Sequence, residues 1–259
     1  MAAENAPRAA IESVRSVERT LDLLAALERA EQPMGLSDLA RATGIPKATA
    51  QRLLTVLERR GFVQKERLSY QLGAAVVPMA GAFLTGSSLA RAALPALEEL
   101  AMASSETASL QVRQGVDRVV VQRVLSVHSL GYSLHIGQRL PLLVGASGLI
   151  LAGGMPSEGL SLLMDSVGEI RLADGRLLSH TDLLAKIEAV RRQGFAVSRG
   201  EREGGVISVA APILRTGYPL NAAIAVTGPT SRMAEEKVDQ LSITVKQVAA
   251  DIAKVYSRM

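Results

Sequence analysis

Apolar residues recur at helical spacing in the first part of the chain, starting near Ser16. This period predicts an amphipathic helix. Its apolar stripe is Val17, Leu21, Leu24 and Leu27. A break at residues 31–35 precedes a short helix over 38–43, for which Ser37 is the expected N-cap and Gly44 the expected stop. The chain therefore opens with two helices separated by a short break.

A turn at residues 44–46 connects the short helix to a longer one. Pro46 suits the first turn of that longer helix, and Gly61 ends it. Its inward residues are Leu53, Leu54 and Leu57. Two short strands, 62–64 and 70–72, follow with a charged tip between them. This order is typical of a winged helix-turn-helix domain, in which one helix braces the fold and another lies in the DNA major groove.

Beyond residue 73 the pattern predicts a larger, mixed region. Residues 74–88 are apolar and small, which indicates a linker helix, and an amphipathic helix resumes at Leu89. Val and Leu alternation predicts strands over 108–113, 118–125, 132–136, 206–214 and 222–227. Helices are predicted over 157–164, 182–193 and 232–258. The predicted domains are a disordered tail (1–13), a winged helix-turn-helix (14–73), the linker helix and an α+β domain (89–259).

Composition narrows the classes of function. Of the 259 residues, 48% are hydrophobic and 21% charged, as in ordinary globular proteins. The absence of cysteine excludes disulfides, thiolate zinc sites and cysteine nucleophiles, and three histidines disfavour a multi-histidine metal site. No apolar run is long and unbroken enough for a signal peptide core or a membrane span. We therefore expect a cytoplasmic protein with no membrane association and no cofactor.

Positive charge is concentrated in one short segment. The whole chain carries +4, and residues 47–67 hold six basic side chains against two acidic ones. Such clustering is typical of a nucleic-acid surface, although a solvated helix face followed by a charged hairpin explains it equally well. On the longer helix, the residues opposite the leucines are types that read bases or contact phosphates. The predicted DNA-binding residues are Ser37, Lys47, Ala48, Thr49, Gln51, Arg52, Lys65 and Arg67.

Several segments resemble the IclR family of bacterial transcriptional regulators. GLSDLARATGIPKATAQRLLTVLERRGFV, followed by YQLG, is similar to the DNA-binding domain of that family. LPLLVGASGLILA, RRQGFAVSRGEREGGVISVAAPI and AVTGPTSRM resemble its effector-binding domain, in the same order. The resemblance implies an α+β protein with an N-terminal winged helix-turn-helix domain, a linker helix and a C-terminal GAF-like domain that binds a small molecule. It also implies dimers or tetramers that act on a promoter.

The resemblance further implies an effector pocket. The matching residues are Ser129, Tyr132, Leu140, Ala146, Ser147, Ser198, Val206 and Ser208. Ser198 and Ser208 stand where relatives with keto-acid effectors have an acidic residue and a cysteine, and Leu149 replaces the lysine of a common ALGKA motif. A helix that starts near Ser147 would point backbone N–H groups into the pocket. Hydroxyls without a fixed charge favour an aromatic or weakly acidic metabolite over a compact dicarboxylate.

The sequence thus predicts a ligand-responsive transcriptional regulator, interpreted as a repressor, that binds a palindromic promoter as a homodimer or tetramer. An effector would act by binding one of two arrangements better than the other. His128, His135 and Asp117 raise the question of a hydrolase, but no G-x-S-x-G motif accompanies them. An enzyme that uses the second domain as its active site and an architectural DNA-binding protein without a ligand remain alternatives. Promoter binding that a metabolite reverses would separate the three.

Overall fold

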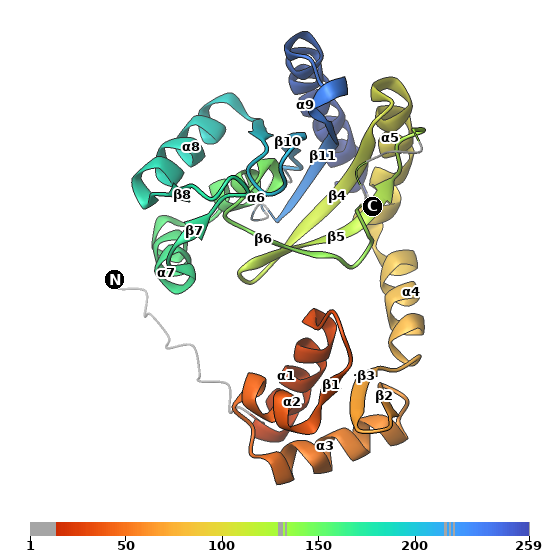
Figure 1. Cartoon of the computed structure of the whole chain (residues 1–259). Coiled ribbons are helices and arrows are strands. Elements are labelled where there is room, and N and C mark those ends of the chain that lie inside the picture. Colours follow the sequence, from red (N-terminus) through yellow and green to blue (C-terminus); the bar gives the residue numbers. More distant parts are fainter. Residues whose placement is uncertain are drawn as a thin grey trace, which may run out of the picture. The chain divides into compact units, whose positions relative to one another are not determined.

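The structure is a computed structural model. It describes residues 14–128, 132, 134–214, 217, 219 and 221–258. The chain divides into two compact units, Met1–Phe83 and Leu84–Met259 (Figure 1). The boundary between them falls within residues 74–88, the predicted linker, and each unit has its own apolar core.

The first unit packs helices against a small antiparallel sheet. The helices are α1 (Arg15–Arg29), α2 (Leu36–Thr43) and α3 (Lys47–Arg59). The strands are β1 (Met34–Gly35), β2 (Val63–Glu66) and β3 (Ser69–Leu72), in the order β1-β3-β2. Leu23, Leu39, Leu54 and Tyr70 are fully buried in the core between them. Gly44 ends α2 with a φ of 66°, a left-handed conformation that lets the chain turn sharply into α3.

Two details of the first helices differ from the sequence prediction. Val17 and Leu21 are 53% and 59% exposed, whereas Leu23 and Leu27 are buried, because α1 turns a different face toward α2 and α3. The predicted apolar stripe was wrong in its first half. Ser37 was also wrong as an N-cap: α2 begins at Leu36, and its N-cap is Gly35. Because Gly35 is paired with β3 as part of β1, the chain enters the helix directly from a strand.

Helix α4 (Val76–Gly86) lies in the segment predicted as a linker helix. It is rich in apolar residues and buries none of them. Val77, Met79 and Phe83 are all more than half exposed. Exposed apolar side chains such as Val77, Met79 and Phe83 are suited to pack against another molecule.

The second unit is built on a six-stranded antiparallel sheet in the order β6-β5-β4-β11-β10-β9. The strands are β4 (Thr107–Gln114), β5 (Asp117–Val124), β6 (Arg139–Pro141), β9 (Ala196–Arg199), β10 (Val206–Pro212) and β11 (Ala222–Pro229). Helices α5 (Ser88–Ser104) and α9 (Glu235–Tyr256) share one apolar core with the sheet, and a 3-10 turn at Thr230–Arg232 precedes α9. The α+β fold class is confirmed.

A second apolar core fills the other side of this unit (Figure 1). It contains α6 (Ala146–Gly153), α7 (Ser157–Val167) and α8 (His180–Gln193), together with the short hairpin β7 (Ile170–Arg171) and β8 (Leu177–Leu178). Because helices cover both faces of the sheet, nearly every residue of β11 is buried. Within the described parts of the chain, no helix is long and apolar enough to cross a membrane.

The strand predicted over 132–136 is wrong. Tyr132 and the described residues 134–136 belong to no strand, and β6 begins only at Arg139. Tyr132 and Leu134 instead pack with Val120 and Leu140 in a small cluster of their own. Tyr132 and Leu134 therefore pack against strands β5 and β6 without forming a strand of their own.

Candidate functional site

Helix α3 separates buried from outward-facing residues in the way a DNA-reading helix requires. Lys47, Ala48 and Arg52 are exposed, whereas Thr49 and Gln51 are half-buried. The buried residues of α3 are Ala50, Leu54 and Leu57. Lys47 and Arg52 are free to approach a phosphate or a base edge without disturbing the core.

Gln51 differs from its neighbours because it is tied to the hairpin. Its Oε1 accepts a hydrogen bond from the hydroxyl of Tyr70 at 3.3 Å, and its Nε2 donates to Thr55 Oγ1 at 3.4 Å. A side chain held at both ends has less freedom to reach DNA, so these bonds favour a role in fixing α3 against β3. Ser37 is exposed in the first turn of α2.

The β2–β3 hairpin presents two of the predicted basic residues. Lys65 Nζ lies 5.6 Å from the centre of the Tyr70 ring, within the range of a cation–π contact. Arg67 is exposed at the tip with a φ of 54°, an uncommon conformation for a residue with a side chain. Leu68 beside it is 84% exposed. The tip therefore extends away from the core and is accessible to a partner.

The second unit contains a cavity of about 40 Å³ between the sheet and the start of α6. Seven of the eight residues predicted to form the pocket line it: Tyr132, Leu140, Ala146, Ser147, Ser198, Val206 and Ser208. Ser129 lies outside the described residues. The sequence prediction missed further lining residues, which are Gln111, Arg118, Leu134, Gly145, Glu201, Arg202, Glu203 and Thr227.

A row of hydroxyl groups crosses the sheet at the cavity. Ser198 of β9 is paired with Ser208 of β10, which is paired with Thr227 of β11, and Thr227 is paired with Thr107 of β4. The hydroxyls of Ser208 and Thr227 are 2.9 Å apart. The side-chain hydroxyl of Ser198 makes no hydrogen bond to another described residue, so it is available to a ligand.

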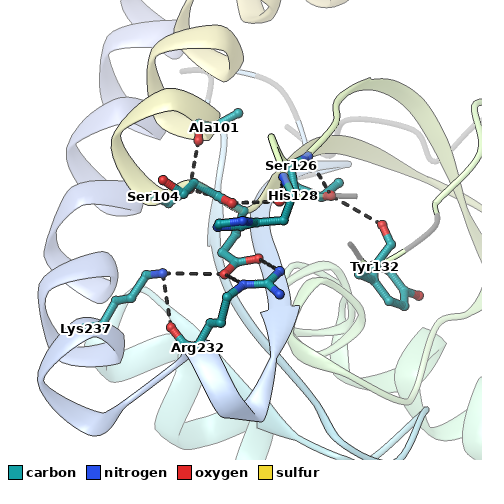
Figure 2. Close-up of polar contacts among 10 residues, drawn as sticks. Ala101, Ser104, Ser126, His128, Tyr132, Arg232 and Lys237 are labelled. Carbon is teal, nitrogen blue, oxygen red and sulfur yellow. Dashed lines mark hydrogen bonds and ion pairs between the residues drawn. The ribbon is translucent and has the colours of Figure 1, made fainter. Parts of the chain in front are cut away.

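The backbone of Tyr132 is held in the cavity wall by Thr107 of β4, which follows a buried charged residue (Figure 2). Thr107 Oγ1 donates to the backbone oxygen of Tyr132 at 3.3 Å. The residue before it, Glu106, is fully buried and accepts two 2.8 Å hydrogen bonds from the Arg232 guanidinium, with Lys237 Nζ at 3.6 Å. Because a buried carboxylate must be paired to be stable, this cluster fixes β4 next to the cavity.

The most deeply buried charge at the cavity is Arg118 of β5, whose residue is 3% exposed. Its Nε donates to Gln111 Oε1 at 2.8 Å, and its Nη1 donates to the backbone oxygens of Val144, at 2.7 Å, and Pro141. Burial first, and then the positive charge of Arg202, lower the pKa of Arg118 to about 9, while Asp117 raises it. The guanidinium remains charged at neutral pH.

Arg202, in the loop between β9 and β10, is the second cation at the cavity. Its guanidinium carbon lies 5.3 Å from the centre of the Tyr132 ring, and its Nη2 donates to Glu203 Oε2 at 3.3 Å. Burial lowers the pKa of Arg202, against a raising effect of Glu203. The sequence interpretation that the pocket offers no fixed charge was therefore wrong, because it considered only the residues matched to the family.

Glycines allow α6 to start against the cavity. Gly145 has a φ of 83° and is the N-cap of the helix, which begins at Ala146. Its backbone N–H donates to Glu201 Oε2 at 3.3 Å. A Cβ at Gly148 would lie 2.6 Å from Arg118 Nη1 and closer still to the backbone oxygen of Leu142. The close approach of α6 to Arg118 therefore requires glycine at position 148.

The residues considered for a hydrolase do not form a triad. His128 and His135 are exposed, and Asp117 lies 3.6 Å from Arg139 in an ion pair. Within the described ranges, no group of three or more histidine and acidic side chains is arranged to hold a metal ion.

Both units match known protein families. Residues 16–67 match the IclR helix-turn-helix domain, and residues 81–254 match the C-terminal domain of bacterial transcriptional regulators of the IclR type. The chain belongs to the IclR family. It is a DNA-binding transcriptional regulator, and the match covers both the outward-facing helix α3 and the cavity.

Individual relatives are similar over nearly their whole length. The transcriptional repressor IclR of Escherichia coli is 27% identical over 95% of this chain and 91% of its own. The glycerol operon regulatory protein of Streptomyces griseus is 30% identical over 93% and 96%. The crystal structure of an IclR-type regulator from Silicibacter sp. TM1040 superimposes with a TM-score of 0.83, at 26% identity over 93% of this chain and 96% of that one. These relatives favour the regulatory prediction over the enzyme alternative.

Proposed function

We propose that this regulator is a repressor that binds a palindromic promoter as a homodimer or tetramer and releases it when a small metabolite occupies the cavity in the second unit. The observation that carries the proposal is that side chains from distant strands, a loop and α6 line one cavity. The same chain has a helix, α3, with basic residues on its outward face. A metabolite shifts promoter affinity only if it binds one of two arrangements better. Because its target is the chromosome, the regulator acts in the cytoplasm.

The direct test uses the full chain and a fluorescent fragment of the DNA upstream of its own gene. Specific binding at physiological salt, measured against a scrambled fragment, and release by a metabolite support the proposal. Binding without discrimination between the two fragments contradicts the operator assignment. Conversion of the metabolite during the assay would instead favour the enzyme alternative.

Arg52 and Arg67 are expected to differ in what they contribute to promoter binding. Arg52→Ala removes a base-reading side chain, so we expect a loss of about 1–3 kcal/mol on the operator and weaker discrimination at one base pair. Arg67→Ala removes a phosphate contact, so we expect weaker binding to all sequences and a salt slope reduced by about 1. Anisotropy titrations at three salt concentrations, on operator and scrambled DNA, measure both. An unchanged operator affinity in Arg52→Ala would contradict the placement of α3 in the groove.

The exposed apolar residues of α4 are expected to form a contact between protomers. One recognition helix covers few base pairs, and a two-fold dimer doubles the site with half-sites about 34 Å apart or at multiples of that distance. Met79 and Phe83 lie four residues apart on one face of α4, and Val17 and Leu21 of α1 are exposed as well. The chain is predicted to divide into residues 14–73, 74–88 and 89–259. Helix α4 lies in residues 74–88, so we expect this segment to form the contact between protomers.

We expect the double variant Met79→Ser/Phe83→Ser to dimerise roughly 100-fold more weakly, because two apolar side chains per protomer lose a buried partner. Sedimentation equilibrium at micromolar concentration measures the constant. Met102→Ser on α5 is the matched control, since Met102 is also an exposed methionine, at 73%. Equal dimerisation of the double variant and the control would show that α4 is not the contact.

A further inference from the structure

The cavity of the second unit reaches solvent along one short segment. Four of its lining residues are not buried, and these are Arg202, Glu203, Val206 and Ser208. The other described lining residues are buried. All four belong to the β9–β10 loop or to the start of β10. The mouth of the cavity, as far as the described residues form it, therefore lies along residues 202–208.

Arg202 covers an aromatic ring at this mouth. Its guanidinium carbon lies 5.3 Å from the centre of the Tyr132 ring, within the range of a cation–π contact. Tyr132 packs beside Val206, which is itself a residue of the mouth. The Arg202 side chain is 25% exposed. It therefore covers part of the ring while it also reaches solvent.

The polar contacts that hold Arg202 in this place are weak. Its Nη2 donates to Glu203 Oε2 at 3.3 Å, and Glu203 is more than half exposed, so water competes for the pair. Among the residues that the structure describes, the guanidinium makes no other hydrogen bond or ion pair. The charge of Arg202 also lowers the pKa of Arg118, which means that the two cations repel each other. The contact with the Tyr132 ring is therefore the main attraction that keeps Arg202 at the mouth.

The backbone on both sides of Arg202 is fixed, so the side chain can leave the ring by itself. Glu201 Oε1 accepts from Lys186 Nζ at 2.8 Å, and the Glu201 backbone oxygen accepts from the N–H of Ala173 at 2.8 Å. The backbone oxygen of Gly205 accepts a 2.8 Å hydrogen bond from the 3-10 turn before α9. Rotation of a partly exposed side chain between these two anchors is fast and needs no movement of the strands.

We propose that Arg202 is a gate at the mouth of the cavity and selects the effector by size and shape. With Arg202 on the Tyr132 ring, the cavity of about 40 Å³ holds roughly three water molecules and admits only a compact ligand. A larger ligand enters only when the guanidinium leaves the ring. It then binds well only if it has a flat apolar face that covers Tyr132 instead. The inference rests on the proposed function only in that the selected ligand is the effector.

The test uses the absence of cysteine from the chain. Ser198→Cys places a single thiol in the cavity, at a residue that is 5% exposed, and Ser147→Cys does the same from the start of α6. Methyl and benzyl methanethiosulfonate are both neutral and differ in size. The rates at which they modify the thiol report how easily a small and a large reagent pass the mouth. Intact-protein mass spectrometry of quenched full-length samples follows both reactions.

Removal of the Arg202 side chain should speed the large reagent more than the small one. In Arg202→Ala we expect the benzyl reaction to be about tenfold faster, because the cation–π contact that must break is no longer there. Arg202→Lys keeps a cation that reaches the ring and should restore part of the protection. An unchanged benzyl rate in Arg202→Ala, or an equal gain with both reagents, would overturn the proposal.

Two controls separate a gate from a general loosening of the second unit. Arg199→Ala removes an exposed arginine of β9 that does not line the cavity, so it should leave the benzyl rate of Ser198→Cys unchanged. Ser242→Cys places a thiol on α9 at a residue that is also 5% exposed, and its benzyl rate should not respond to Arg202→Ala. A gain in either control equal to that in Ser198→Cys would show a loosened domain and contradict the gate.

The result for the gate can be told apart from the result for the regulator. If a bulky metabolite releases the promoter, Arg202→Ala should lower the concentration that release requires, because more of the protein is open. Modification that depends on Arg202, together with a promoter complex that no metabolite releases, would uphold the gate and contradict the proposed regulation. Promoter release by a metabolite, together with modification that is independent of Arg202, would contradict the gate alone.

Discussion

Leu54→Ala is expected to abolish promoter binding by unfolding the first unit while the second unit stays folded. Leu54 lies on α3 and is completely buried against residues of α1, α2 and β3. Shortening a buried leucine to alanine costs about 2–5 kcal/mol. A unit of this size buries a small core and has little stability in reserve, so a loss of that order removes most of its folded population.

Thermal unfolding followed by circular dichroism should separate the two units. In Leu54→Ala, the midpoint temperature of the first unit's transition should fall, or that transition should disappear. The midpoint of the second unit's transition should stay within about 1 °C of its value in the parent protein. Val56→Ala is the matched control on the same helix, because Val56 is 46% exposed and its truncation leaves no cavity. One shared transition that shifts as a whole in Leu54→Ala would mean that the units unfold together.

Gly148→Ala is expected to have the second large effect, on the cavity and on the stability of the second unit together. The added Cβ would meet the backbone oxygen of Leu142 and the Nη1 atom of Arg118 at distances that real contacts do not reach. The Leu142 backbone cannot move without disturbing the core around it. Overpacking of this kind costs about 1–3 kcal/mol, and here it also pushes Arg118 away from its carbonyl partners.

Gly153→Ala provides the comparison within the same helix. The nearest atom to a Cβ at Gly153 is 3.8 Å away, so the methyl group fits, and alanine favours the helix by up to about 1 kcal/mol. Denaturant unfolding of both variants measures the difference. We expect Gly148→Ala to be less stable than the parent and Gly153→Ala to be equal or more stable. If Gly148→Ala matched the parent in stability, the close packing of α6 on Arg118 would be refuted.

The sequence predicted most clearly the features that depend on residues close together in the chain, such as helices and turns. The helical period around Leu54 and Leu57, with Gly44 as the expected stop of the short helix before it, predicted the helix-turn-helix, because a helix buries one stripe wherever it packs. The resemblance to the IclR family then named the fold of the second unit. It also indicated residues, among them Tyr132 and Ser198, that the structure brings to one cavity. Their role in binding an effector stays a prediction.

The sequence by itself determined the helices of the first unit, the α+β order of the second and the residues that carry the family resemblance. Only the tertiary structure decided which face of α1 is buried, that Gly35 rather than Ser37 precedes α2, and that Arg118 enters the cavity. The physical reason is that the burial of a residue depends on which helix or strand packs against it, as well as on the spacing of apolar residues along its own element. When both faces of a sheet are covered, the alternation of apolar and polar residues along a strand does not show which face a charged side chain lies on. The position of Arg118 at the cavity therefore follows only from the packing of β5 against the start of α6.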